Sequence, residues 1–505
     1  MKKSITFLLL IAAFCSFAQN AALDPAFGNA GFSITPNTFE FRRFAFDPTG
    51  NIVSMGISKG TGSLDYQLTL TKTDANGIPD TAFGTNGVVL TAIEDAEYPW
   101  GMEIQADGKI LVSGGVRIDA GSSTYSGFVI RYNTDGSVDT TFAANGVYRD
   151  ATLNNFEFMV LLSDGSIIAG ANENMTDKGI LFKLDSNGSL DTSFGINGKL
   201  TIDAVWLTNM ILLSDGKILC IGVDLLDANH TKVGYCKIDG LGNFDTSFGQ
   251  NGMMAINIDT TIDINNMQEV SERPHSAKEL LDGSIVLSGY LSDKFYLGDF
   301  MAKIDSTGFL DTTFGISGIV KHLYEFAVGL EVQPDGKIII GHSKSLSQSV
   351  GYSLTRFNSD GSLDTTFNNG NGFVDIDVTS GSDYLKQIKM QATDTLIIGG
   401  SSSGGIVKGN FTLARILLDT LLSVEEPLEQ FIKVYPNPFE GRFFVEDYEQ
   451  VIKEIKIFDN TGRILKTISE TNTLNEITTN FASGIYHIRI KTKDGRMMNK
   501  KMIKE

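Results

Sequence analysis

One nine-residue phrase occurs seven times in this chain of 505 residues, and it constrains the fold more than any other feature. Its consensus is Leu-Asp-(Thr/Pro)-(Thr/Ser/Ala)-Phe-Gly-x-x-Gly, and neighbouring copies lie 52 to 66 residues apart. A repeat of this length means that one supersecondary unit is copied, so the chain folds as an array of units. The copies centre on Phe27, Phe83, Phe142, Phe194, Phe248, Phe314 and Phe367.

A second phrase, Asp-Gly-(Lys/Ser)-Ile followed by an apolar residue, recurs between the Phe-Gly copies, as at Asp107, Asp164 and Asp335. Asp-Gly between two apolar runs predicts a β-hairpin, because its turn needs residues that tolerate positive φ. A third apolar strand and a fourth strand after the Phe-Gly phrase complete each unit. Seven units of four strands predict an all-β fold, a seven-bladed β-propeller at residues 19–420, with a β-solenoid as the second choice. The 53 glycines and 10 prolines suit many short strands joined by tight turns.

The order of the phrases predicts how the ring closes. The chain contributes a Phe-Gly phrase and its strand, residues 31–35, before the first hairpin, and the last repeat stops after its third strand, residues 411–417. By analogy with other propellers, the strand before Asp-Gly is innermost and the strand after Phe-Gly is outermost. Residues 31–35 are therefore expected to pair with residues 411–417, which leaves no blade with a missing strand.

The N-terminus has the pattern of a signal peptide at residues 1–18. Lys2 and Lys3 precede an apolar run, and Ser16-Phe17-Ala18 forms a small-x-small cleavage site. The apolar run is too short to span a bilayer, and no later stretch reaches the roughly 18 residues that a span needs. We expect an exported protein without a transmembrane anchor.

The repeat pattern ends near Asp419, and an acidic linker at residues 421–433 precedes a different module at residues 434–505. Period-two alternation in this module predicts a small Ig-like β-sandwich. Its motifs are Tyr-Pro-Asn-Pro, Asp-x-x-Gly-Arg, Gly-Ile-Tyr and a basic Lys-Lys-x-Ile-Lys end.

These motifs carry two resemblances. The seven phrases resemble the delta-60 repeat family, whose members look like exported bacterial propellers; this implies architecture but no reaction. The C-terminal module resembles the type A C-terminal sorting domain of the type IX secretion system of Bacteroidota-like bacteria. That resemblance implies recognition by the secretion machinery and delivery to the cell surface or the medium. The residues that match its motifs are Tyr435, Pro436, Asn437, Pro438, Gly462, Arg463, Gly484, Tyr486, Lys500 and Lys501.

The formal net charge of −19 lies in the repeats, because the signal segment and the C-terminal module are both slightly basic. Such a surface repels nucleic acid and anionic lipid. It could attract calcium, and Asp185, Asp191, Asp360 and Asp364 offer several oxygens within short turns. Since Asp at these positions also stabilises the turn through its own backbone, they are weak metal candidates, and no cofactor is predicted beyond a possible calcium ion.

No catalytic motif emerges from the sequence. The five histidines are scattered singly, without zinc-type spacing. Cys220 and Cys236 fall on apolar positions of strands expected to be neighbours. We expect them to be two small core residues, with a cross-strand disulfide as the second possibility.

Function should lie where the repeats differ, near one mouth of the central channel. The start of the predicted inner strand carries an aromatic set with cationic and polar members, which suits sugar stacking or peptide capture. These candidates are Arg42, Arg43, Trp100, Phe156, Trp206, His275, Phe326 and Tyr384.

The leading hypothesis is an exported, non-catalytic propeller that binds an extracellular glycan or protein. Two others stay open: a secreted propeller enzyme acting on polysaccharide, and a structural surface-layer protein stiffened by calcium. The sequence does not identify the ligand.

Overall fold

The computed structural model of the chain describes most of its residues. It leaves out residues 1–19, 61–65, 95, 120–124, 174–177, 204, 228–229, 259–270, 293–296, 324–325, 346–349, 369, 379–380, 404–408, 421–431, 448–449, 460–462, 470–472 and 494–496. The predicted signal peptide, most of the predicted linker and Gly462 therefore lie outside the described residues.

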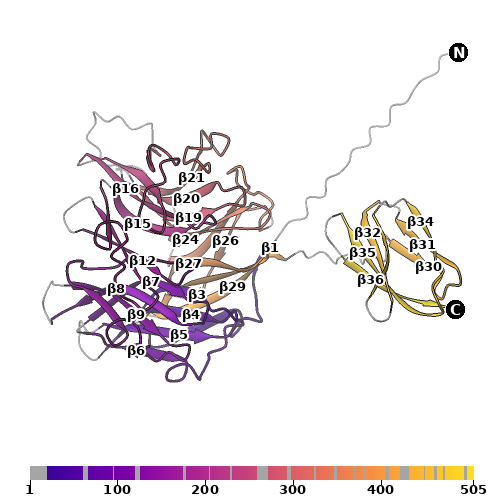
Figure 1. The fold of residues 1–505 in the computed structure, drawn as a ribbon, viewed down its shortest axis with the longest axis horizontal. Coiled ribbons are helices and arrows are strands. Elements are labelled where there is room, and N and C mark those ends of the chain that lie inside the picture. The colour runs from indigo at the N-terminus through magenta and orange to yellow at the C-terminus, as the bar shows by residue number, and fades with distance from the viewer. Residues whose placement is uncertain are drawn as a thin grey trace, which may run out of the picture. The chain divides into compact units, whose positions relative to one another are not determined.

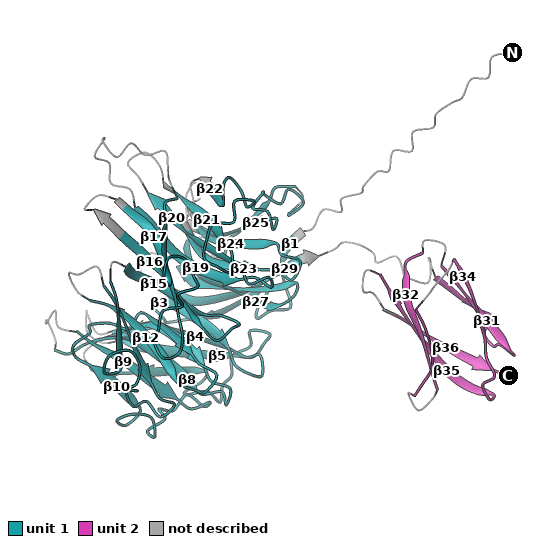
Figure 2. Ribbon diagram, turned by 45° about the horizontal axis from the view of Figure 1, so that its top comes forward, with its two compact units in different colours: residues 1–420 teal, residues 421–505 magenta. Residues whose placement is uncertain are grey.

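The chain divides into two compact units, residues 1–420 and residues 421–505, coloured separately in Figure 2. Every regular element in the described residues is a β-strand, so the predicted all-β class is confirmed. Among the described residues, none forms a helix long and apolar enough to cross a membrane.

The described part of the first unit contains seven antiparallel sheets, each built mainly from consecutive strands (Figure 1). The first strands of the sheets are β3 (Glu40–Phe46), β7 (Ala96–Ile104), β11 (Phe158–Leu161), β15 (Val205–Leu212), β19 (Ser271–Glu279), β23 (Phe326–Val332) and β27 (Ser382–Ala392). The second strands are β4 (Ile52–Lys59), β8 (Ile110–Arg117), β12 (Ile167–Asn172), β16 (Ile218–Asp227), β20 (Ile285–Ser292), β24 (Ile338–Ser345) and β28 (Thr395–Ser403).

The third strands are β5 (Tyr66–Thr73), β9 (Tyr125–Tyr132), β13 (Gly179–Leu184), β17 (His230–Ile238), β21 (Leu297–Ile304), β25 (Val350–Phe357) and β29 (Asn410–Thr420). Six sheets end on a fourth strand: β6 (Val88–Thr91), β10 (Val147–Asp150), β14 (Lys199–Ile202), β18 (Met253–Ile256), β22 (Ile319–Leu323) and β26 (Phe373–Ile376).

The first strands form the inner circle of a propeller. Each first strand contacts the first strand of the next sheet, from β3 through β7, β11, β15, β19 and β23 to β27. Strand β27 in turn contacts β3, so the circle of contacts is closed. The strand before the Asp-Gly turn is therefore innermost, as predicted.

The N-terminal segment closes the ring as the phrase order predicted. Strand β2 (Phe32–Thr35) pairs with β29 in antiparallel register, with Phe32 opposite Ala414 and Thr35 opposite Phe411. A further strand that the sequence did not suggest, β1 (Asn20–Leu23), pairs with the other end of β29. The last sheet therefore has five strands, and its outer edge comes from the start of the chain.

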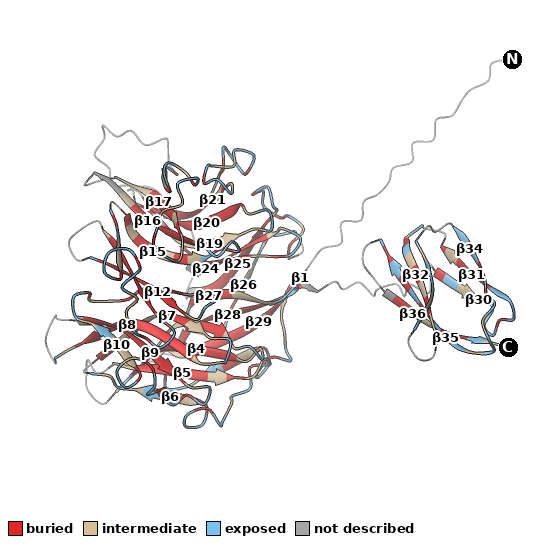
Figure 3. Cartoon of the chain, in the orientation of Figure 1, coloured by how far each residue is buried: buried red, intermediate tan, exposed pale blue. Residues whose placement is uncertain are grey.

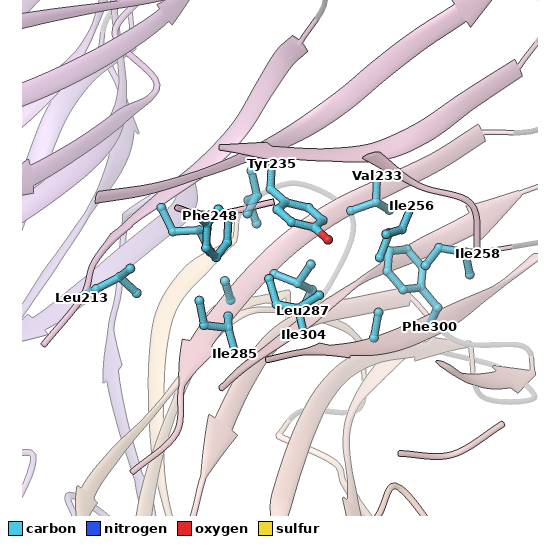
Figure 4. Packing of buried hydrophobic residues seen from close by; sticks show 14 of the residues in the cluster. Leu213, Val233, Tyr235, Phe248, Ile256, Ile258, Ile285, Leu287, Phe300 and Ile304 are labelled. Carbon is cyan, nitrogen blue, oxygen red and sulfur yellow. The ribbon is translucent and has the colours of Figure 1, made fainter. Parts of the chain in front are cut away.

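Apolar side chains between neighbouring sheets hold the circle together. The second strands are buried on both faces, as in β8, where all eight residues are buried (Figure 3). One interface combines Tyr235 and Phe248 of one sheet with Ile285, Leu287 and Ile304 of the next (Figure 4). Phe248 belongs to a Phe-Gly phrase, so the repeated phenylalanine is a between-sheet core residue.

The residue after each phrase phenylalanine links neighbouring sheets. In six copies its backbone N–H donates to a carbonyl in the turn of the next sheet, as Gly195 does to Leu241 at 3.0 Å. A Cβ atom at Gly195 would lie 2.3 Å from the Lys199 carbonyl oxygen, and its φ is +55°. Close approach and positive φ together explain why the phrase keeps glycine there.

The second unit has two antiparallel sheets around one apolar core. Alternation is clear in β35, where buried and exposed residues alternate along the strand. The first sheet contains β30 (Ile432–Tyr435), β31 (Arg442–Asp447) and β34 (Leu474–Thr478). The second contains β33 (Ile464–Ile468), β32 (Ile452–Phe458), β35 (Gly484–Thr492) and β36 (Met497–Lys504).

Candidate functional site: the central cavity

Six of the seven inner strands bulge at the same place. In each, the pairing with the second strand skips one residue, which lies five positions before the residue that starts the Asp-Gly turn. A β-bulge leaves the extra residue outside the ladder and changes where its side chain points. The skipped residues are Arg42, Trp100, Thr208, His275, Val328 and Lys386.

These six residues all line one cavity of about 790 Å³ inside the circle of inner strands. We call them the bulge ring. In the third sheet, the residue five positions before the start of the turn is Glu157, and its N–H donates to the Gly170 carbonyl at 2.9 Å. Because the bulge ring differs at nearly every position, it is where seven similar sheets present different chemistry.

The cavity is lined by more cations than anions, although the chain as a whole is acidic. Five of its lining residues are Lys or Arg and two are Glu. One glutamate, Glu331, pairs with Lys278 at 2.9 Å, and at the rim Glu40 lies 3.3 Å from Arg42 and 3.7 Å from Lys386. Cations therefore outnumber anions among the lining residues of a protein of net charge −19, and glutamates lie close to three of these five cations.

Arg42 and Trp100 form the best-defined contact in the bulge ring. The Arg42 guanidinium carbon lies 4.0 Å from the centre of the Trp100 ring, which is a cation–π geometry. Three buried donors on the inner strands have no hydrogen-bond partner among the described residues: Arg42 Nε and Trp100 Nε1 of the cavity lining, and Arg273 Nε, two residues before the lining residue His275. A buried donor without an acceptor costs about 1–3 kcal/mol, so a ligand that brings acceptors gains this energy.

Ionisable groups in and around the cavity have shifted pKa values. Burial, together with the nearby positive charge of Arg273, lowers the pKa of His275 to about 4, so the imidazole is neutral at pH 7. Burial raises the pKa of Glu157 and of Glu103. Burial also lowers the pKa of Arg43. Such opposed shifts are concentrated at functional sites more often than elsewhere.

His275 contacts a tyrosine that also lines the cavity. The His275 and Tyr290 rings have centroids 5.1 Å apart and an interplanar angle of 34°. The pair combines a neutral imidazole with a phenol in a cationic cavity. These groups can bind a carboxylate-bearing ligand, and they are also of the kind that transfer protons.

At two of the six bulges, the bulge residue accepts a hydrogen bond from the residue after the bulge of the preceding sheet. Arg43 Nε donates to the Trp100 carbonyl at 2.6 Å, and Asn209 Nδ2 donates to the His275 carbonyl at 2.8 Å. Gln387 acts between the last and first sheets, where its Oε1 accepts from the Phe44 N–H at 2.7 Å. The bulge ring is thus held by side chains of neighbouring sheets, which makes its geometry rigid.

The structure brings together four of the eight residues predicted for the mouth: Arg42, Arg43, Trp100 and His275 all line the cavity. Phe156 does not, because it is fully buried between sheets, 4.4 Å from Phe182 by ring centroids. Trp206 and Tyr384 lie outside the cavity lining, and Tyr384 is 48% exposed. The backbone of Phe326 starts β23, but its side chain is not among those described.

Sequence reasoning missed the remaining members of the ring. Thr208, Val328 and Lys386 each follow the predicted residue of their repeat by two positions. Counting back five residues from the start of each turn would have found them. The aromatic residues predicted for these repeats lie before the bulge instead.

The carboxylates considered for calcium are held by their own surroundings. Asp185 Oδ1 accepts from the N–H groups of Asn187 and Ser189, both at 2.9 Å. Asp360 accepts from Ser362 in the same way. Asp191 pairs with Lys183 at 3.3 Å, and Asp364 pairs with Arg356 at 2.8 Å. Within the described part of the chain, no group of three or more His, Cys, Asp or Glu residues is arranged to hold a metal.

The two cysteines of the repeats face each other. Cys220 of β16 lies directly opposite Cys236 of β17, and both thiols are buried and unbonded in the structure. A hydrogen bond with Cys236, together with burial, raises the pKa of the Cys220 thiol. The pair therefore packs as two small core residues.

In the second unit, Asn437 joins the proline-rich motif to the basic C-terminal strand. Its Nδ2 donates to the Lys501 carbonyl at 2.9 Å, and its Oδ1 accepts from the Ile503 N–H at 2.8 Å. Both flanking prolines, Pro436 and Pro438, follow cis peptide bonds. Two motifs at opposite ends of the module are thus one structural feature.

The other motif residues lie on the same small fold. Tyr435 is 39% exposed and donates through its hydroxyl to Glu446. Arg463 pairs with Asp459 at 3.1 Å. Gly484 opens β35, Lys500 lies on β36, and the Tyr486 hydroxyl donates to the Ala482 carbonyl at 2.6 Å.

Comparisons with known proteins agree with this division. Residues 433–505 match the family model of a secretion system C-terminal sorting domain. Residues 105–142, 162–194 and 333–367 match a domain of unknown function, DUF5122, described as a beta-propeller. A search of curated proteins finds no match.

Several solved structures match long stretches of this chain at low sequence identity. PorZ of Porphyromonas gingivalis, described as an essential surface component of the type-IX secretion system, is 13% identical with a TM-score of 0.39; the match covers 95% of this chain but 60% of PorZ. A protein of unknown function from Dyadobacter fermentans is 12% identical over 78% of this chain and 100% of its own, with a TM-score of 0.44. The polysaccharide lyase Uly1 is 11% identical over 80% and 98%, with a TM-score of 0.41.

Each of the two family matches falls on the unit that its motifs indicated. Segments of the propeller therefore match DUF5122 repeats, the delta-60 type, and the C-terminal module matches a sorting domain that indicates export by type IX secretion to the cell surface or the extracellular space.

Proposed function

We propose that the propeller is an extracellular binding module whose central cavity takes an anionic group, a carboxylate or a sulfate, on a glycan or protein. The observation that carries this proposal is a set of unpartnered buried donors: Arg42 Nε and Trp100 Nε1 in the cavity lining, and Arg273 Nε, two residues before the lining residue His275. The lining contains five cations and two anions. All three are donors, so they call for a ligand that supplies acceptors. An oxyanion supplies acceptors and balances the excess positive charge as well.

The cavity favours such a ligand through geometry as well as charge. Arg42 lies over the Trp100 ring, so a bound ligand meets a cation and an aromatic face at one point. The fixed bulges hold these groups in place before binding, which reduces the ordering cost of association. The acidic remainder of the protein repels anions, so binding would be confined to this cavity.

Binding of acidic glycans and acidic peptides to the whole secreted chain tests the proposal. Polygalacturonate, alginate, chondroitin sulfate and poly-glutamate would be compared with neutral dextran by calorimetry. We expect at least one acidic probe to bind, and affinity to fall with added salt because the attraction is electrostatic. Arg42→Ala should weaken it by about 10- to 100-fold, the loss expected for a hydrogen bond to a charged group.

Two tryptophans provide a matched pair for the site. Trp100→Ala should weaken binding of the same probe, whereas Trp206→Ala, the same change outside the cavity lining, should leave it unchanged. Equal effects of the two substitutions, or binding unaffected by Arg42→Ala, would contradict the proposed site. Melting curves of each variant check that it folds.

A second candidate function is an enzyme that acts on an acidic polysaccharide, and the His275–Tyr290 contact favours it. A neutral imidazole can take the proton from the carbon next to a uronate carboxylate, and the nearby cations would stabilise the charge that develops there. The electron pair left on that carbon would form a C=C bond and break the glycosidic C–O bond at the neighbouring carbon, and the Tyr290 hydroxyl would donate a proton to the leaving oxygen. The test is incubation of the same glycans with the protein and with His275→Ala and Tyr290→Phe. Shortened chains with wild-type protein only would establish it, and intact chains after long incubation would exclude it.

A further inference from the structure

Four aromatic side chains form a row at the ends of the first two sheets. Phe39 lies just before β3, Tyr66 starts β5, Tyr98 belongs to β7 and Tyr125 starts β9. Consecutive ring centroids are 5.6, 5.8 and 5.9 Å apart. We call these four residues the aromatic row.

The aromatic row is not part of the hydrophobic core. All four side chains are half-buried, and none belongs to the buried clusters between the sheets. The phrase phenylalanines of the same two sheets, Phe83 and Phe142, are by contrast completely or almost completely buried. Four adjoining rings that keep contact with solvent form an amphipathic surface, with apolar faces and phenol hydroxyls side by side.

Two members of the aromatic row lie close in sequence to residues that line the central cavity. Tyr98 precedes Trp100 by two residues on the same strand, and Phe39 precedes Arg42 by three. Arg42 and Trp100 are themselves stacked and line the cavity. A molecule held by the cavity at this point would therefore meet the row as it leaves the cavity.

We propose that the aromatic row is a stacking platform for an extended acidic glycan whose charged group occupies the cavity. This rests on the proposed function and narrows its ligand to a polysaccharide. A sugar ring has an apolar C–H face that packs on an aromatic ring and hydroxyls that bond to phenol groups, and successive rings repeat this pattern along a chain. An acidic peptide would use the cations but has no such repeat for four aromatic rings.

The proposal is tested by the effect of chain length on affinity. Size-fractionated oligosaccharides of polygalacturonate, alginate and chondroitin sulfate, from disaccharide to octasaccharide, are titrated into the whole protein. Affinity of at least one series should rise about tenfold or more from disaccharide to octasaccharide, as expected for added stacking contacts. The double variant Tyr66→Ala/Tyr98→Ala should lose this rise while the disaccharide still binds within about twofold of wild type.

Two controls guard against loss of structure. Tyr66→Leu and Tyr98→Leu keep apolar volume but remove the aromatic face, and they should also flatten the length dependence. Tyr148→Ala removes a tyrosine of similar packing, 5.6 Å from Phe182 by ring centroids, on the outer strand β10, and should leave the length dependence unchanged.

The outcomes separate the two proposals. If acidic glycans bind but affinity does not rise with length, or if the rise survives loss of both tyrosines, the aromatic row is not a platform and the cavity proposal stands. If poly-glutamate binds at the cavity and no glycan series does, the polysaccharide assignment is wrong. If no acidic probe binds at all, both proposals fail.

Discussion

At the scale of single residues, the backbone conformation of the repeat restricts which residue types fit at certain positions. The residue after the phrase phenylalanine has φ between +44° and +55° in all seven copies, and it is glycine in five. Ala143 and Asn368 are the exceptions, with φ of +44° and +48°. A side chain with Cβ is strained in this region, and asparagine tolerates it better than alanine does.

Ala143→Gly should therefore stabilise the protein. The substitution relieves the left-handed strain, which is about 1–2 kcal/mol for an ordinary residue, and this exceeds the entropy that glycine costs in the unfolded chain. Chemical denaturation measures the change. Gly195→Ala, the reverse substitution at the equivalent position, should destabilise by more, and a loss of stability in Ala143→Gly would contradict this account.

The aspartate of the phrase is the partner of a third-strand cation in six of the seven copies. Arg356 is the most buried example: its Nε lies 2.8 Å from Asp364 Oδ2, and its guanidinium carbon lies 4.3 Å from the centre of Phe367. Asp364→Asn removes the charge opposite a fully buried arginine and should cost about 3–5 kcal/mol of unfolding free energy. Asp311→Asn, at the more exposed equivalent pair with Lys303, should cost clearly less.

The same contacts predict little dependence on calcium. The candidate carboxylates Asp185, Asp191, Asp360 and Asp364 already accept hydrogen bonds from their own turns or pair with lysine or arginine. We expect the melting temperature to be the same with calcium and with a chelator. A fall of several degrees on chelation would favour the calcium-stiffened alternative.

At the scale of elements, the sequence predicts the repeated strands and their pairing but not the β-bulges that interrupt them. Pairing of residues 31–35 with residues 411–417 followed from turn signals and phrase order alone, and the observed β2–β29 register confirms it. The bulges were not predictable in this way, because an extra residue shifts every preceding side chain to the other face of the strand. Trp206 and Tyr384 precede the bulge, which is why two conspicuous aromatic residues lie outside the cavity lining while Thr208 and Lys386 form part of it.

The closing strands should be essential for stability. Deletion of residues 20–35 removes β1 and β2, exposes the edge of β29 and takes Phe27 out of the core between sheets. We expect loss of the cooperative melting transition or a fall of more than ten degrees in its midpoint, since several buried apolar side chains are lost together. Melting within a few degrees of the parent chain would show that the ring is stable without β1 and β2.

At the scale of the whole molecule, the distribution of charge sets the pH response. The turn carboxylates have lowered pKa values in the folded state; that of Asp245 falls from 3.8 to about 2 through hydrogen bonds with Lys217 and Ser247. Hydrogen bonds with Thr49, Asn51 and Lys72 outweigh burial and likewise lower the pKa of Asp47 to about 2. A carboxylate with a lowered folded pKa stabilises the protein above its unfolded pKa and loses this effect as the pH falls towards its folded value.

Stability should therefore be nearly constant from pH 7 to about pH 4.5 and fall steeply from pH 4 to pH 2. Because many repeats carry such a carboxylate, protons should be taken up by several groups as the chain unfolds. Denaturation at a series of pH values measures this. A stability that rises on acidification below pH 4 would show that relief of the net charge of −19 outweighs the loss of these contacts.

The pairing of β1 and β2 with β29 has a consequence for the order of events during export. Asn20 lies opposite Thr420, so the first and last residues of the propeller are neighbours although 400 positions separate them in the chain. A chain that crosses a membrane from its N-terminus presents β1 and β2 first, yet these strands have no partner until the last repeat has emerged. The ring can therefore close only when the whole propeller has crossed the membrane. The sorting domain follows the propeller in the sequence, after the linker. A truncated chain would lack both the closed ring and the export signal.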